Sequence, residues 1–203
     1  MNIKNIIFDF GGVVMDWDPR YFFKDHFNDD DKMEYFLKNI VTDEWNGEQD
    51  RGRTLAEGTE IQVAKHPEWE KEIRAYYDNW ITMLKSDIPH NVEVLRKLEH
   101  SKYELFGLTN WSAETFPYAL ENYDFFTIFK EKIVVSGTEK LIKPDPTIWN
   151  LLLNRYQIKA EESVFIDDNA KNIEVAKSLG FICVHIEENT NLEKELREIG
   201  VQF

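Results

Sequence analysis

The stretch Ile6–Pro19, IIFDFGGVVMDWDP, sets the first constraint on the fold. A short, continuous apolar run leads to a single acid, Asp9, and such a run is typical of a strand buried on both faces of a sheet. In an open parallel sheet, ligands bind at the carboxyl ends of the strands. Asp9 therefore lies where a functional residue is expected, and the bare glycine two residues later, Gly11, needs its own explanation.

The composition excludes several classes of partner. The 203-residue chain carries 38 acidic and 24 basic residues, a formal net charge of −14, which repels nucleic acid and anionic membranes. Its single cysteine, Cys183, cannot form an internal disulfide and sits in a run typical of a buried strand. No apolar run approaches the ~20 residues of a membrane span, and no signal-peptide pattern is visible. We expect a cytoplasmic protein that acts on a small molecule.

Short apolar runs alternate with helical patterns through most of the chain. The expected strands lie at 5–10, 103–110, 132–137, 163–168 and 181–186. The expected helices lie at 92–100, 113–123, 147–156, 170–180 and 191–200. This alternation predicts an α/β fold in which helices cover both faces of a doubly wound, Rossmann-like parallel sheet.

Residues 19–84 differ from the rest of the chain, because they show helical patterns and no convincing strand. The simplest account is an all-helical cap inserted after the first strand. The predicted catalytic core is then 1–16 together with 87–203, and the predicted cap is 17–86. The linkers on either side of the cap are expected to act as a hinge.

Polar side chains occur at or just beyond the ends of the predicted strands. Taken singly, each is as readily a turn former or a helix cap. Together they predict a site, because carboxylates that converge at one sheet edge are costly unless a cation offsets them. Oxygen ligands without histidine or cysteine clusters suit Mg²⁺. These residues are Asp9, Thr109, Asn110, Lys143, Asp167 and Asp168.

This set of residues predicts phosphoryl transfer. Asp9 is a candidate nucleophile that would attack phosphorus and form an aspartyl-phosphate. Thr109, Asn110 and Lys143 are candidates to hold the phosphoryl oxygens. A Mg²⁺ ion that bridges Asp9 and the phosphate would cancel the repulsion between them.

The ordered motifs resemble those of the haloacid dehalogenase (HAD) superfamily, specifically its phosphatases with a helical cap after the first strand. The motifs are IIFDFGGV at 6–13, LTN at 108–110, IKPDP at 142–146 and FIDDN at 165–169. The resemblance covers essentially the whole chain. It implies a Mg²⁺-dependent phosphoric monoester hydrolase whose cap selects the substrate.

The resemblance also implies roles for single residues. Asp9 would be the nucleophile and would bind Mg²⁺ together with Asp168, and Asp167 would assist, through a water molecule. The residues expected to hold the phosphate are Thr109, Lys143, Asn110 and Gly12.

Gly11 departs from the family pattern. The family's phosphatases usually have an aspartate there, whose backbone carbonyl binds the metal and whose side chain protonates the leaving group and then activates water. Gly11 keeps the first capacity, so it is a predicted Mg²⁺ ligand, and lacks the second. In this respect the sequence looks most like a branch of sugar-phosphate phosphatases that includes a glucose-1-phosphate phosphatase. A sugar phosphate is therefore the expected substrate.

Two explanations for the missing acid stay open. A good leaving group, such as an anomeric sugar oxygen, needs less protonation, and we favour this explanation for the first step. The other explanation is a substitute carboxylate that reaches the site when the cap closes. The candidates are Asp16, Asp18 and Asp50.

Two other functions also stay open. A 2-haloacid dehalogenase shares the fold and the nucleophilic aspartate but needs no metal, and the acidic pair Asp167 and Asp168 argues against it. A non-catalytic pseudo-phosphatase whose cap binds a partner is supported chiefly by Gly11. Metal chelation would separate the first function from a phosphatase, and a lack of turnover on many esters would favour the second.

Several residues of the predicted cap are candidates for the substrate pocket. The polar stretch 44–53, EWNGEQDRGR, is expected to be a solvated connection between helices. If it faces the site instead, an arginine would contact phosphate and Trp45 a sugar face. Trp17 is expected at the hinge or the pocket rim, and Trp69 and Trp80 in the core of the cap.

Overall fold

Five parallel strands form the central sheet in the computed structural model, which describes residues 2–203. Their order is β5–β4–β1–β6–β7, so β1 lies in the middle. Each strand falls within one of the predicted ranges, and the predicted parallel sheet is confirmed. The strands are β1 (Asn5–Phe8), β4 (Glu104–Thr109), β5 (Ile133–Val135), β6 (Ser163–Asp167) and β7 (Ile182–His185).

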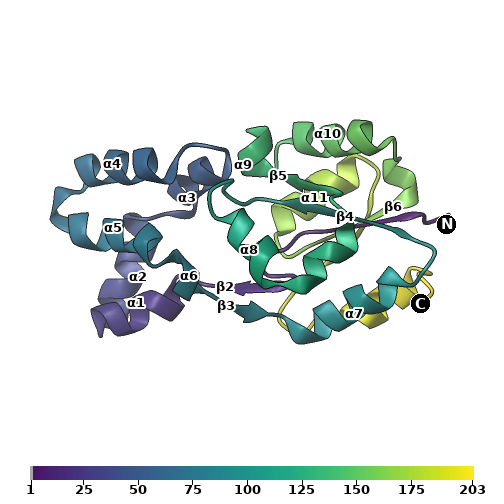
Figure 1. Ribbon diagram of the computed structural model, residues 1–203, viewed down its shortest axis with the longest axis horizontal. Coiled ribbons are helices and arrows are strands. Elements are labelled where there is room, and N and C mark those ends of the chain that lie inside the picture. Colours follow the sequence, from purple (N-terminus) through teal and green to yellow (C-terminus); the bar gives the residue numbers. More distant parts are fainter. Residues whose placement is uncertain (1) are drawn as a thin grey trace.

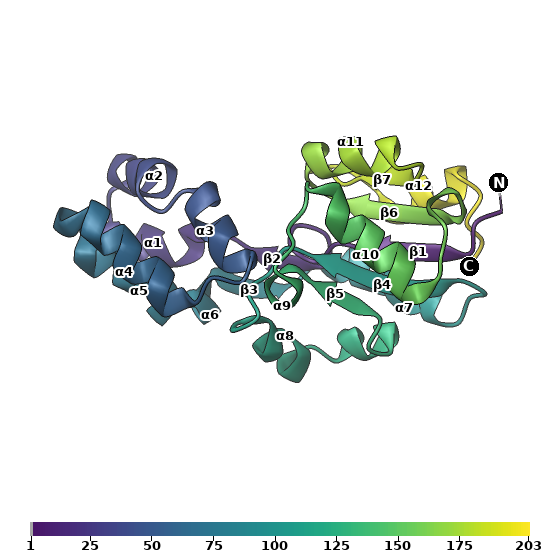
Figure 2. The ribbon, with the colours of Figure 1, turned by 90° about the horizontal axis from the view of Figure 1, so that it is seen from above.

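β1 is buried throughout because helices cover both faces of the sheet (Figure 2). Successive side chains of a strand point to opposite faces. Ile6 and Phe8 pack in the core cluster that α7, α8 and α12 share, whereas Ile7 packs in the cluster that α10 and α11 share. The helices are α7 (Pro89–Glu99), α8 (Phe116–Asn122), α10 (Pro146–Tyr156), α11 (Ala170–Ser178) and α12 (Leu192–Glu198), with the short α9 (Ser136–Glu139) after β5.

The inserted helices lie beside the core and have an apolar core of their own (Figure 1). They are α1 (Arg20–Phe27), α2 (Asp30–Asn39), α3 (Asp43–Asp50), α4 (Leu55–Lys65), α5 (Glu70–Asp78) and α6 (Trp80–Met83), with a 3₁₀ turn at Pro67–Trp69. Capping side chains start several of them, as when Thr54 accepts from the N–H of Glu57. The predicted helical character of the cap is thereby confirmed for residues 20–83. Among residues 2–203, no helix has the length and apolar character needed to cross a membrane.

The cap joins the core through a two-stranded antiparallel ribbon that the sequence did not predict. It consists of β2 (Met15–Trp17) and β3 (Leu84–Asp87), with Asp16 opposite Ser86. The expectation that no strand occurs up to residue 84 is therefore wrong at its last position. The predicted boundaries after residues 16 and 86 fall inside this ribbon, and the division into core and cap at those points stays a prediction.

The expectation of a solvated connection at 44–53 is wrong, because most of this stretch is helix α3. Trp45 is buried in the cap core, where its indole N–H donates to the Gly58 carbonyl at 2.9 Å. It offers no face to a substrate. Trp80 is a second correction, since it packs with the core cluster and its ring lies 5.9 Å from that of Trp111. Trp69 does pack against the cap core, as expected.

Candidate active site

The carboxyl ends of β1 and β6 bring three carboxylates together. Asp9 follows β1 and is fixed in register by its N–H, which donates to the Ile166 carbonyl at 2.9 Å. Asp167 ends β6 and Asp168 follows it. One carboxylate oxygen from each of the three residues lies within 4.8 Å of the others. This is the convergence at the sheet edge that the strand ends predicted.

A buried ammonium group lies between two of these carboxylates. Lys143 Nζ is 2.8 Å from Asp9 Oδ2 and 2.7 Å from Asp167 Oδ2, and it also donates to the Leu108 carbonyl at 3.0 Å. Desolvation opposes its charge, but the two ion pairs raise the pKa of Lys143 above its ordinary value. Lys143 therefore stays a cation in the site.

Asn110 holds the backbone of this lysine. Its Nδ2 donates to the Lys143 carbonyl at 2.9 Å, and its Oδ1 accepts from the Lys143 N–H at 2.9 Å. A side-chain amide that makes both bonds is engaged in positioning the loop after β5. The side chain of Asn110 therefore helps to place Lys143, and its role in holding phosphate stays a prediction.

The two acids of the pair differ in their surroundings. Asp167 is fully buried, and besides Lys143 it accepts from the Asn169 N–H at 2.8 Å and from Asn172 Nδ2 at 3.0 Å. Its lone pairs are largely used, so it suits the orientation of Lys143. Asp168 is exposed, which leaves its carboxylate available to a ligand.

The phosphate-binding role of Gly12 stays a prediction, and the structure gives a separate reason for glycine at this position. Its N–H donates to the Met15 carbonyl at 3.0 Å. Its φ is +67°, and a β-carbon there would lie 2.2 Å from Asp168 Oδ2. Glycine is needed at this position because it adopts the left-handed conformation without strain and leaves room for the carboxylate of Asp168.

The cluster has more negative than positive charge. Desolvation raises the pKa of Asp9 to about 8, Lys143 opposes this shift, and Asp167 and Asp168 add to it. Desolvation and Asp167 likewise raise the pKa of Asp168. Three carboxylates around one ammonium group form a set of oxygen donors that a divalent cation would stabilise in the ionised state.

The hydroxyl of Thr109 is a further candidate to bind a ligand at this sheet edge. Its hydroxyl is buried at the end of β4 and has no hydrogen-bond partner within residues 2–203. An unsatisfied buried hydroxyl is costly, and such groups are rare in folded proteins. A phosphate oxygen at the adjacent carboxylate cluster would satisfy it.

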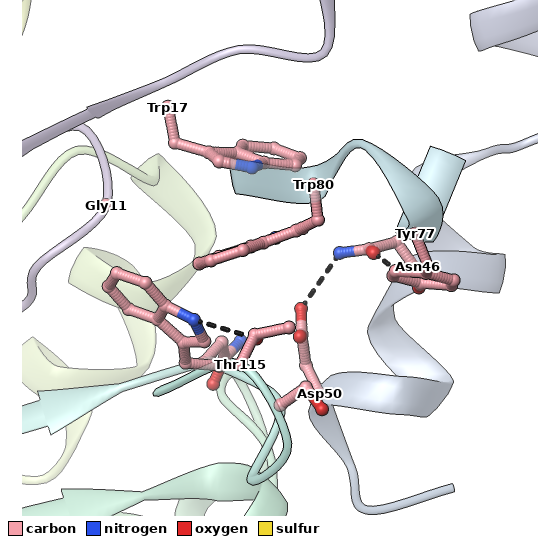
Figure 3. A pocket seen from close by; sticks show the side chains of 10 residues that line it. Gly11, Trp17, Asn46, Asp50, Tyr77, Trp80 and Thr115 are labelled. Carbon is pink, nitrogen blue, oxygen red and sulfur yellow. Dashed lines mark hydrogen bonds between the residues drawn. The ribbon is translucent and has the colours of Figure 1, made fainter. Parts of the chain in front are cut away.

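A cavity of about 100 Å³ lies between the cap and this sheet edge, next to Gly11 (Figure 3). Its walls are largely aromatic, with several polar groups among them. The sequence had suggested Trp17, whereas the other aromatic walls were missed because they come from segments far apart in the chain. The lining residues beside Gly11 are Trp17, Tyr77, Trp80 and Trp111, with Asn46, Asp50, Asn110, Ser112 and Thr115.

The three aspartates that could replace the acid absent at Gly11 have different surroundings. Asp16 accepts from the Tyr21 hydroxyl at 2.8 Å, and Asp18 accepts from the Arg20 N–H at 2.8 Å. Both are thus engaged at the first helix of the cap. Asp50, in contrast, lines the cavity that Gly11 also lines.

A comparison of the chain with known protein families agrees with this fold and this site. Residues 6–186 match the model of the haloacid dehalogenase-like hydrolases, and the chain belongs to this family. The superfamily inferred from the four motifs is therefore confirmed, and the protein is a hydrolase.

Similar proteins extend along most of the chain. D-ribitol-5-phosphate phosphatase of Bacteroides thetaiotaomicron is 25% identical, over 97% of this chain and 98% of its own. A sesquiterpene phosphatase of Aspergillus oryzae is 25% identical, over 97% of this chain and 96% of its own. A solved HAD family enzyme of B. thetaiotaomicron, in complex with magnesium and inorganic phosphate, matches with a TM-score of 0.71 at 25% identity, over 96% of this chain and 100% of that chain.

Proposed function

We propose that this hydrolase is a Mg²⁺-dependent phosphatase that cleaves small phosphate monoesters through an aspartyl-phosphate on Asp9. The observation that carries the proposal is the cluster itself. Three carboxylates lie within 4.8 Å of one another, and one buried ammonium group pairs with two of them. The unpartnered hydroxyl of Thr109 nearby fits a phosphate oxygen. The phosphatases among its relatives support the same chemistry.

The residues that would hold Mg²⁺ are Asp9, Asp168 and the backbone carbonyl of Gly11. Asp167 would act mainly through Lys143, because Lys143 and the amide groups around it already occupy its oxygens. When bound, Mg²⁺ would offset the carboxylate charge and polarise a phosphoryl oxygen. The exposed position of Asp168 and the space that Gly12 leaves for it fit this assignment.

In the first step, a carboxylate oxygen of Asp9 attacks phosphorus and the bond to the leaving oxygen breaks. Lys143 and Thr109 donate to the phosphoryl oxygens, where negative charge must be stabilised. In the second step, water attacks the phosphorus of the aspartyl-phosphate, inorganic phosphate leaves and the carboxylate of Asp9 is restored. Both steps need a proton carrier at the leaving or attacking oxygen, and Gly11 has no side chain to supply one.

We propose a sugar phosphate as the substrate class. Aromatic walls with a few polar groups are typical of small-molecule pockets, and Asp50, Asn46 and Ser112 would match the hydroxyl groups of a sugar. The relative that acts on ribitol 5-phosphate supports this class. The indole and phenol rings of the cavity also fit an apolar ester, the class of substrate that the sesquiterpene phosphatase suggests.

The test is a panel of sugar, polyol, prenyl and aryl phosphates, assayed with Mg²⁺ and with EDTA. We expect hydrolysis that EDTA abolishes and that Asp9→Asn removes almost entirely. Asp25→Asn, at an exposed position of α1, is the matched control and should retain wild-type rates. Turnover of 2-haloacids that survives EDTA would favour a dehalogenase, and no turnover of any ester would favour a pseudo-phosphatase.

A further inference from the structure

The cavity beside Gly11 contains one carboxyl group that the steps above leave unused. Asp50 ends α3, and its Oδ2 accepts from Asn46 Nδ2 at 3.0 Å (Figure 3). The N–H of Ser112, in the loop after β4, also donates to this carboxyl group. The backbone carbonyl of Asp50 accepts from the Ser136 hydroxyl at the start of α9. Asp50 is thus a cap residue that hydrogen bonds fix against the core.

Gly11 lines the same cavity and leaves space in it. A β-carbon at Gly11 would meet no atom within 4 Å, and its φ is not positive. The position where the family usually has a side-chain acid is therefore open. Asp50 lines the same cavity from the cap side.

We propose that Asp50 carries out the proton transfers that the missing side chain at Gly11 cannot. The inference rests on the proposed phosphatase function. When Asp9 attacks phosphorus, the protonated carboxyl of Asp50 gives its proton to the leaving oxygen, and the alcohol departs neutral. When water attacks the aspartyl-phosphate, the Asp50 carboxylate takes the proton of that water and returns to its first state.

The surroundings of Asp50 suit an acid that cycles near neutral pH. Desolvation raises the pKa of Asp50 to about 7, and the Ser112 N–H opposes the shift. A proton carrier works best when its pKa is close to the working pH. The other charged groups on its own segment are Asp43, Glu44, Glu48, Arg51 and Arg53, and titratable or charged groups on the elements around it include Tyr76, Tyr77, Glu114, Glu139 and Lys140.

Asp50→Asn tests the inference, with leaving groups of two kinds. A sugar 6-phosphate has a poor leaving group, so its turnover should fall about 10²–10⁴-fold. With p-nitrophenyl phosphate, the first step needs little protonation. The variant should then release a full burst of nitrophenol followed by a slow steady state, because only dephosphorylation lacks its base. Glu48→Gln, on the exposed side of α3, is the matched control and should behave as wild type.

Two further measurements separate proton transfer from a structural role. In the wild type, kcat/KM for the 6-phosphate should fall as pH rises through about 7, because the first step needs protonated Asp50. Asp50→Asn should lose this limb. The double variant Gly11→Asp with Asp50→Asn should recover part of the lost turnover, since the space at Gly11 accepts a side chain.

The outcomes are distinct. If the wild type hydrolyses the 6-phosphate and Asp50→Asn does so equally fast, the inference is overturned but the proposed function stands. An equal loss of the nitrophenol burst and of 6-phosphate turnover would show a structural role and would also overturn it. No wild-type turnover of any ester would overturn the proposed function and the inference together.

Discussion

Gly12 and Asp168 approach so closely that a β-carbon on residue 12 would lie 2.2 Å from Oδ2 of Asp168. The loops after β1 and β6 therefore meet at a point where any side chain would displace a proposed Mg²⁺ ligand. Gly12→Ala should lower the affinity for Mg²⁺ by about 10–100-fold, as the loss of ligand-supporting groups commonly does. Isothermal titration with Mg²⁺ measures this without any substrate.

Gly11→Ala is the matched comparison for that titration. Its β-carbon would meet nothing within 4 Å, and its backbone carbonyl stays in place. We expect its Mg²⁺ affinity to stay within about threefold of the wild type, since no ligand moves. Equal affinities in the two alanine variants would contradict the proposed contact between Asp168 and the metal.

Asp168 and Lys143 should respond differently to added metal. Asp168→Ala removes a proposed ligand, so high Mg²⁺ should restore part of the activity. Lys143→Met removes the cation that pairs with Asp9 and Asp167, and saturating Mg²⁺ should not replace it. Initial rates against Mg²⁺ concentration provide the measurement, and identical responses would refute this division of roles.

Lys143→Met should also destabilise the fold. The ammonium is buried, and its removal leaves the carboxylates of Asp9 and Asp167 without their counter-charge. Breaking a buried pair from one side costs about 3–5 kcal/mol of the free energy of unfolding. Urea unfolding without metal measures the loss, and Lys38→Met on the exposed side of α2 should show little change.

Asp50→Asn should raise stability at alkaline pH and leave it unchanged at acid pH. Burial raises the pKa of Asp50 from 3.8 to about 7, so the folded state holds the proton more tightly than the unfolded state. The ionised carboxyl therefore costs stability, fully above about pH 7 and not at all below about pH 4. After allowance for screening by solvent in the cavity, the gain at pH 8 should be about 1–3 kcal/mol.

Thermal melts at pH 8 and pH 4 test this expectation independently of activity. Glu48→Gln should have the melting temperature of the wild type at both pH values, because Glu48 is exposed. A melting temperature for Asp50→Asn that is unchanged at pH 8 would show that the carboxyl group is not desolvated.

Cap closure has a direct reporter in the amide of Leu55. This N–H at the start of α4 donates to Glu114 Oε1, in the loop before α8, at 2.9 Å, so the bond spans cap and core. We expect Mg²⁺ with orthovanadate, a phosphate analogue, to slow hydrogen exchange at Leu55 and along β2 and β3. Ile73, inside the cap core, should exchange at the same rate with and without the analogue. Unchanged exchange at Leu55 and in both strands would argue against a moving cap.

Much of the site could be predicted because strand ends are visible in the sequence. Asp9, Thr109 and Asp168 each follow a continuous apolar run, and parallel strands bring such ends to one edge. Lys143 could be predicted as well, as a positive charge beside these carboxylates. The positions of strand ends do not reveal which partner a polar group at such an end will bond to. Asn110 and Gly12 occupy suitable positions, yet the side-chain amide of Asn110 bonds to Lys143 and the N–H of Gly12 bonds to Met15.

The cap was harder to predict for reasons of packing. The buried face of helix α3 includes a polar residue, Gln49. Its side-chain amide donates to the Trp45 carbonyl and the Tyr77 hydroxyl. Periodicity of apolar residues cannot reveal such a face. Trp17, Trp80 and Trp111 likewise converge from segments whose order in the chain says nothing about their proximity. The ribbon of β2 and β3 is too short for a pattern of alternation.

That ribbon has a consequence for how such an enzyme is assembled. Because Asp16 lies opposite Ser86 in an antiparallel pair, the chain leaves the core and returns to it at neighbouring points. A two-residue turn suffices to close an antiparallel ribbon of this kind. The helices inserted between β2 and β3 are therefore not required to form the ribbon or the five-stranded sheet. Exchange of this one segment between related genes would give the same chemistry a new recognition module, with the order of the five strands untouched.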